Sequence, residues 1–181
     1  MTLSAFSAGE LELLVGLPYR VGVLISHAED DEGNVDDERE KMTLESCLRG
    51  VAGLHTDEPL IRDIAQETLR RKDQWQEWAE TDLTVEADAR RAAALLFRKA
   101  SLQEAKDYRA FVMEIAWTVA RTYGEFTSFK EDKGSGVFNT LVGKIVGGFS
   151  SIARSDTGHP MNISAAEDSI LSALSDALDP E

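Results

Sequence analysis

Five carboxylates crowd one short stretch of this sequence, and they are its strongest candidate for chemistry. They lie on both sides of Gly33: Asp30, Asp31, Glu32, Asp36 and Asp37. Hard divalent cations such as calcium and magnesium bind through several oxygen ligands, which clustered carboxylates offer. The spacing excludes an EF-hand, because with Gly33 as the sixth loop residue the first and twelfth positions are Ala28 and Arg39. A less regular oxygen site remains, and its alternative is a solvated turn whose acids favour the N-terminus of the following helix.

The other residue types that carry chemistry are scattered along the chain. His27 lies four residues before Asp31, so the two side chains share a helical face and are candidates for one metal. His55 and His159 are isolated in predicted loops, and an ordinary histidine is the preferred interpretation for all three. The sequence has no His-Glu-x-x-His, dinucleotide-loop, P-loop or Gly-x-Ser-x-Gly motif. We therefore expect a protein that is not an enzyme, with a divalent cation, calcium or magnesium, as its candidate cofactor.

Composition narrows the class of partner. The chain of 181 residues has a net charge of −14, and residues 28–46 alone hold nine acids and two bases. Such a chain repels a phosphate backbone, so we expect no nucleic-acid partner.

Cys47 is the only cysteine, which excludes an internal disulfide and favours a buried apolar role. The N-terminal stretch lacks the basic residues of a secretory signal, and no segment has the composition of a membrane span. We expect a cytoplasmic protein whose partner is another protein.

Apolar residues recur with the 3.6-residue period of amphipathic helices, and no stretch shows the sustained alternation of a strand. The predicted helices cover residues 17–28, 37–51, 57–79, 84–102, 104–123 and 164–178. Pro18 suits the first turn of the first helix. Asp37-x-x-Glu40 and Ser164-x-x-Glu167 are of the capping-box type that begins a helix. The sequence predicts an all-α fold, a single compact bundle of about six to seven helices.

Part of this pattern is repeated within the chain. A shift of 91 residues places the apolar face of the first helix on that of the fifth, and a shift of 127 residues relates the second helix to the last. The matched pairs include Leu17 with Tyr108, Val21 with Val112, Ile25 with Ala116, Leu44 with Leu171, Cys47 with Leu174 and Val51 with Leu178. Gly33 and Gly124 coincide as the ends of the first helix and its copy. Residues 126–162, which are rich in glycine, then form an insertion into one domain that covers residues 1–181.

The first copy of the repeat resembles the helix–turn–helix of the TerB-like tellurite-resistance family. This resemblance rests on residues 23–48, VLISHAEDDEGNVDDEREKMTLESCL. Residues 162–178, NISAAEDSILSALSDAL, resemble the second helix start of the same family. It implies a compact all-helical fold, a bacterial stress-response context and, in some members, divalent-cation binding by acidic side chains near these turns. The chain departs from the family pattern at Arg39, where a glutamate is typical, and at Tyr123-Gly124, where Asp-Gly is typical.

Three functions are compatible with these patterns. The leading interpretation is a non-enzymatic, stress-linked binding or scaffold protein with a divalent-cation site at the acidic turn. The first alternative is a metal-independent module that docks another protein through its acidic faces or through the apolar face of residues 137–152. The second is a small-ligand carrier or enzyme with a pocket between helices. Four aromatic residues are candidates to line such a pocket: Trp75, Trp78, Trp117 and Tyr123. Packing in the core is the preferred role for all four.

Overall fold

Seven α-helices make up the part of the chain that the structure describes, which is residues 1–28, 37–128 and 163–179 of a computed structural model. They are α1 (Ala8–Ala28), α2 (Asp37–Ala52), α3 (Pro59–Arg70), α4 (Trp75–Ala79), α5 (Val85–Lys99), α6 (Leu102–Ser128) and α8 (Ala165–Ala177). Three short 3-10 segments accompany them: η1 (Leu3–Ala5), η2 (Lys72–Gln74) and η3 (Asp82–Thr84). No strand occurs in these ranges, and the predicted all-α bundle is confirmed.

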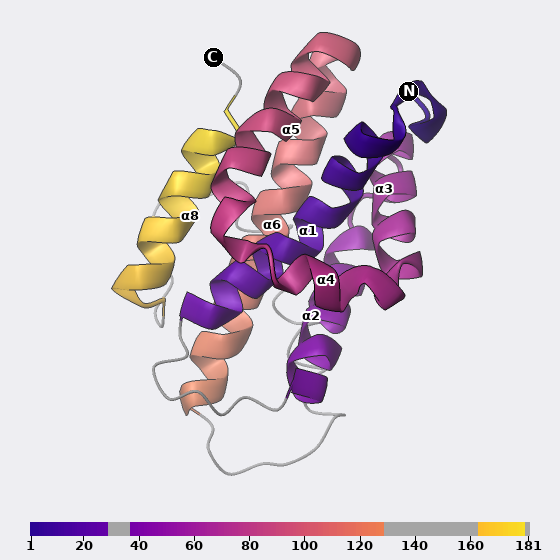
Figure 1. Cartoon of the computed structure of the whole chain (residues 1–181). Coiled ribbons are helices and arrows are strands. Elements are labelled where there is room, and N and C mark those ends of the chain that lie inside the picture. Colours follow the sequence, from indigo (N-terminus) through magenta and orange to yellow (C-terminus); the bar gives the residue numbers. More distant parts are fainter. Residues whose placement is uncertain (29–36, 129–162, 180–181) are drawn as a thin grey trace.

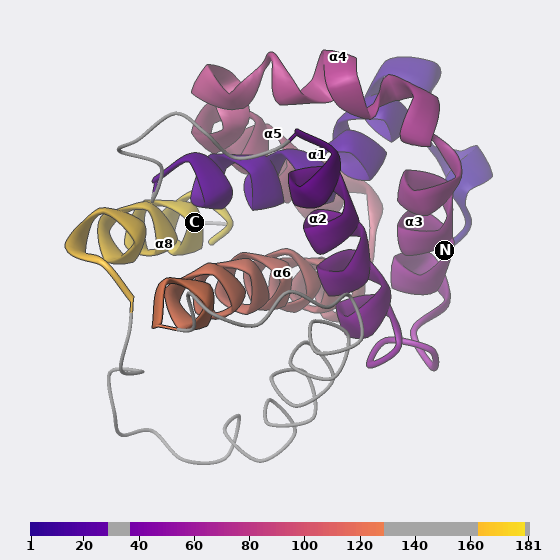
Figure 2. The same cartoon turned by 90° about the horizontal axis from the view of Figure 1, so that it is seen from below.

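Helix α1 is the central element of the bundle. It packs against each of the other six described α-helices, with α6 as its most extensive neighbour. In the view from below, α4 and α6 lie on opposite sides of α1, and α8 and α3 lie on its two flanks (Figures 1 and 2). All residues from Leu14 to Val23 are buried, and apart from Arg20 this part of the helix is apolar on every face rather than along one stripe.

Two glycines allow other helices to approach α1 closely. A Cβ atom on Gly16 would lie 3.3 Å from the indole of Trp78 in α4. A Cβ atom on Gly22 would lie 2.9 Å from the Cδ2 atom of Leu44 in α2. At both positions a large residue of a neighbouring helix occupies the space that a side chain would need, so Gly16 and Gly22 serve packing.

The position of Pro18 differs from the prediction. Because α1 begins at Ala8, Pro18 lies in the helix interior rather than in the first turn. A proline has no N–H and cannot bond the carbonyl four residues earlier, which is that of Leu14. The hydroxyl of Tyr108 in α6 donates to this carbonyl at 2.9 Å. The helix continues through the proline because a neighbouring helix supplies the missing donor.

The predicted helix over residues 57–79 is wrong as a single element. Helix α3 ends at Arg70, the chain turns at Arg71, and η2 leads into α4. The last carbonyls of a helix have no partner within it, and here the indole N–H of Trp75 donates to the carbonyl of Thr68 at 3.1 Å. The turn also stacks Trp75 on Tyr19 of α1, with ring centroids 4.3 Å apart. Aromatic packing on α1 therefore divides a segment that is helical by its local pattern.

The predicted repeat is matched by burial. Both members of each pair are buried: Leu17 and Tyr108, Val21 and Val112, Ile25 and Ala116, Leu44 and Leu171, Cys47 and Leu174, and Val51 and Leu178. The prediction that α6 ends at Gly124 is wrong, because the helix runs on to Ser128, and one interior glycine costs a helix only about 1 kcal/mol. Residues 126–128, assigned to the insertion, are thus the last of α6, and residues 129–162 lie outside the described ranges.

Candidate functional site

The predicted acidic turn falls largely outside the described part of the chain. Asp30, Asp31, Glu32 and Asp36 lie within residues 29–36, outside the described residues, and Asp37 is the first residue of α2. The predicted sharing of a metal between His27 and Asp31 falls outside the described residues for the same reason. The structure does describe the two helix ends that flank this turn, which are the end of α1 at Ala28 and the start of α2 at Asp37.

A contact across these helix ends joins the last turn of α1 to the first turn of α2. The hydroxyl of Ser26 donates to the carboxylate of Glu40, and Nε2 of His27 lies 3.6 Å from the same carboxylate. Glu40 is half-buried, whereas the His27 side chain is 48% exposed. Burial, and next the charge of Glu40, raise the pKa of Tyr19 to about 12. The carboxylate of Glu40 therefore adds to the effect of burial in disfavouring ionisation of the Tyr19 phenol.

His55 is not isolated, and that prediction is wrong. Its imidazole is buried between two carboxylates: Nδ1 lies 2.5 Å from Glu58 Oε2, and Nε2 lies 2.8 Å from Glu114 Oε2. Burial opposes charge on the ring, yet the hydrogen bonds to Glu114 and Glu58 outweigh burial and raise the pKa of His55. The i, i+3 spacing to Glu58 was available in the sequence as a signal. The contact with Glu114 was not, because it depends on how α6 packs.

A second buried charge pair, which sequence reasoning missed, lies between α1 and α5. Nη1 of Arg20 is 2.8 Å from Asp88 Oδ2, and Nη2 donates to the carbonyl of Thr81 and to the hydroxyl of Thr84, both at 2.6 Å. Arg91 bonds the other oxygen of Asp88 at 2.7 Å. An arginine inside the most apolar run of the chain was the signal that could have found this pair. It fixes α1 to η3 and to the first turn of α5.

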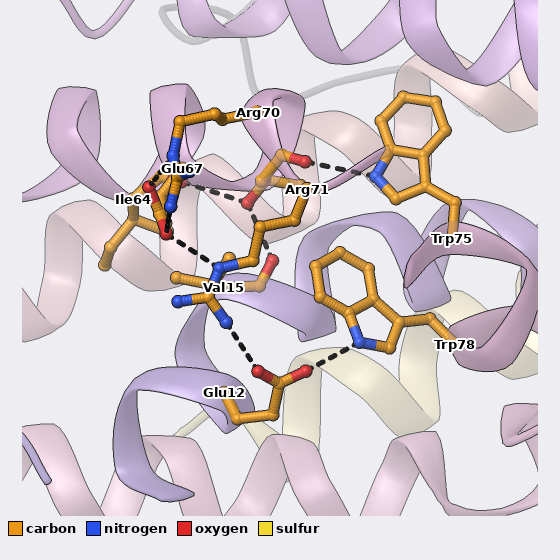
Figure 3. A network of polar contacts seen from close by, with 9 residues as sticks. Glu12, Val15, Ile64, Glu67, Arg70, Arg71, Trp75 and Trp78 are labelled. Carbon is orange, nitrogen blue, oxygen red and sulfur yellow. Dashed lines mark hydrogen bonds and ion pairs between the residues drawn. The ribbon is translucent and has the colours of Figure 1, made fainter. Parts of the chain in front are cut away.

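The tryptophans of α4 pack into the core and do not line an open site. Trp75 and Trp78 are 3% and 6% exposed, so core packing is confirmed for them. Figure 3 shows how their polar edges are bound: Glu12 of α1 accepts from the Trp78 indole at 2.7 Å and from Arg71 at 2.6 Å. Arg71 also bonds Glu67 at 2.7 Å. Hydrogen bonds from Arg70, and then from Arg71, lower the pKa of Glu67 to about 2.

These contacts define the class of protein: it is an all-helical bundle in which hydrogen bonds between buried charged side chains link neighbouring helices. Within residues 1–28, 37–128 and 163–179, no three His, Cys, Asp or Glu side chains gather in a way that could hold a metal ion. None of the described helices is long and apolar enough to cross a membrane. The chain has no significant match among protein families, curated proteins or solved structures.

Proposed function

We propose that this chain is a non-enzymatic, stress-linked binding or scaffold protein of the cytoplasm that holds a divalent cation at its acidic turn. The resemblance of the α1–α2 segment to the TerB-like family suggests both the stress context and the cation. The proposed ion is calcium or magnesium, and its proposed ligands are the carboxylates of Asp30, Asp31, Glu32, Asp36 and Asp37.

The observation that carries the proposal is the contact of Glu40 with Ser26 and His27. It holds together the two helix ends between which residues 29–36 connect, and those residues contain five acids and no base. Like charges on neighbouring residues repel one another, because consecutive Cα atoms are only about 3.8 Å apart and exposed charges are screened over a Debye length of about 8 Å. A divalent cation that binds several of these carboxylate oxygens relieves the repulsion and stabilises the folded protein.

The contacts of the buried histidine and arginine support a binding role rather than catalysis. A general acid or base must reach the atom from which it takes a proton. His55 and Arg20 are 5% and 8% exposed, and their polar contacts lead to other helices of the same chain. These groups stabilise the bundle, which favours a scaffold that presents its surface to a partner protein.

The experiment is a titration of the full, chelator-treated chain with calcium, magnesium, manganese and zinc, followed by calorimetry and thermal unfolding. At a hundredfold excess over Kd the bound ion adds about 2.7 kcal/mol of stability. In a chain of this size that corresponds to a rise in Tm of about 5–10 °C. The rise must exceed that given by a monovalent salt at the same ionic strength.

The matched variants separate a bound ion from general screening. Asp31→Asn with Asp36→Asn should abolish the additional rise in Tm. Asp73→Asn with Asp107→Asn removes an equal number of negative charges from η2 and α6, and this variant should keep the additional rise in Tm. If divalent and monovalent salts act alike on the wild type, and Asp31→Asn with Asp36→Asn raises stability slightly, the cation site is rejected. The metal-independent interaction module then becomes the preferred function.

A further inference from the structure

The buried imidazole of His55 is held in an arrangement that only its charged form can satisfy. Its two nitrogens face Glu58 Oε2 at 2.5 Å and Glu114 Oε2 at 2.8 Å, on opposite edges of the ring. A neutral imidazole has one N–H donor and one acceptor, whereas the imidazolium has two donors. With both carboxylates ionised, a neutral ring would direct a lone pair at one of them. Loss of the proton therefore breaks one of the two contacts.

These two contacts join three elements of the bundle. His55 lies in the connection between α2 and α3, where its amide donates to the carbonyl of Ala52 at 3.3 Å. Glu58 is the N-cap residue of α3, and Glu114 lies on α6. The ring also packs edge-on against Phe111 of α6, with centroids 5.4 Å apart. Thus two carboxylates face the His55 ring, that of Glu58 at the start of α3 and that of Glu114 on α6. The last carbonyl of α2 accepts from the backbone amide of His55.

We propose that His55, Glu58 and Glu114 form a pH-sensitive latch, which holds the α2–α3 connection against α6 while the imidazole is charged and releases it when the proton leaves. The latch involves none of the residues of the acidic turn, and it holds whether or not a cation binds there.

The sign of the pH dependence follows from the direction of the shift. Because the two glutamates raise the pKa of His55 above its ordinary value of 6.5, the closed state binds the proton more tightly than the open state. The stabilisation is complete below the pKa of the free histidine, provided that the glutamates are ionised. It is lost as the pH rises through the pKa of the closed state. The opening equilibrium changes by about tenfold for each unit that separates the two pKa values.

The test combines two measurements on the full chain between pH 6 and pH 10. The first is an NMR titration of the His55 ring, which should give a pKa above 6.5. The second is hydrogen exchange at the amides of Leu54, His55 and Glu58, which are hydrogen-bonded in the α2–α3 connection. After correction for intrinsic exchange rates, the protection of these amides should fall through the same pH range in which the ring titrates. A ring pKa at or below 6.5, or protection that does not change with ring titration, overturns the proposal.

Two variants distinguish a latch from a histidine that only packs. In Glu114→Gln, the amide can donate to the unprotonated nitrogen, so the contact persists at high pH and the pH dependence of protection should flatten. His55→Gln should likewise remove that pH dependence. Asp107→Asn removes a carboxylate of α6 that contacts Gln103 rather than His55, and it should leave the wild-type profile intact. If Glu114→Gln and His55→Gln shift protection equally at every pH, the role of His55 is packing and the latch is rejected.

Discussion

The phenolic hydroxyl of Tyr108 donates to the carbonyl of Leu14, the helical carbonyl that Pro18 cannot bond. Burial raises the pKa of Tyr108 above its ordinary value, so the phenol keeps its proton and remains a donor at neutral pH. Tyr108 is also the repeat counterpart of Leu17. Helix α6 thus supplies the donor that the proline of α1 requires, and this hydrogen bond joins the two helices.

Tyr108→Phe should lower the free energy of unfolding by about 1–3 kcal/mol, because it keeps the ring but leaves a buried carbonyl without a donor. Urea unfolding followed by tryptophan fluorescence measures the loss. In a Pro18→Ala background the new N–H of residue 18 can bond Leu14, so the same substitution should cost about 1 kcal/mol less. Strictly additive costs in this double-mutant cycle would show that the hydroxyl does not replace the missing helical bond.

Asp88→Ala should cost about 3–5 kcal/mol of unfolding free energy, because it leaves the buried guanidinium of Arg20 without its charged partner. Asp63→Ala, which removes the partner of Arg62 from an exposed pair, should cost no more than about 1 kcal/mol. Chemical denaturation of the two variants under the same conditions makes the comparison. Equal costs would contradict the placement of Asp88 in the interior.

Cys47 should resist thiol reagents in the native protein. Its side chain is fully buried against Thr122, and burial raises its pKa to about 12, so thiolate is scarce and inaccessible at pH 8. Labelling should be at least about a thousandfold slower than for an exposed thiol, since it requires global opening. The reference is Cys47→Ala with Ser169→Cys, which places one thiol on the exposed face of α8. Comparable labelling rates would contradict the burial of Cys47.

The predicted capping box at the start of α8 is confirmed: Ser164 Oγ accepts from the amide of Glu167, and the Glu167 carboxylate accepts from the amide of Ser164. Ser164→Ala should therefore destabilise the protein by about 1 kcal/mol. Ser169→Ala, on the exposed face of the same helix, should be neutral or slightly stabilising, because alanine has the higher helix propensity. Thermal unfolding compares the two serines. A loss at Ser169 as large as at Ser164 would argue against the cap.

The sequence by itself determined the helices whose stability depends on local pattern. Periodicity placed α2, α5 and α8 to within three residues of their observed ends, because an amphipathic stripe and a cap are properties of neighbouring positions. Periodicity also identified inner positions such as Val21 and Val112, both of which are buried, whereas the internal repeat itself stays a prediction. The all-α fold followed from the same pattern.

Only the tertiary structure decided where polar groups far apart in the chain meet. The interior position of Pro18 depends on a donor in α6, and the break after Arg70 depends on rings that pack against α1. The sequence predicted that His55 is isolated in a loop, yet its ring bonds Glu114, which lies 59 residues away in the sequence. Such contacts have no local signature, because helix periodicity specifies which face is buried but not which residue of another helix lies opposite.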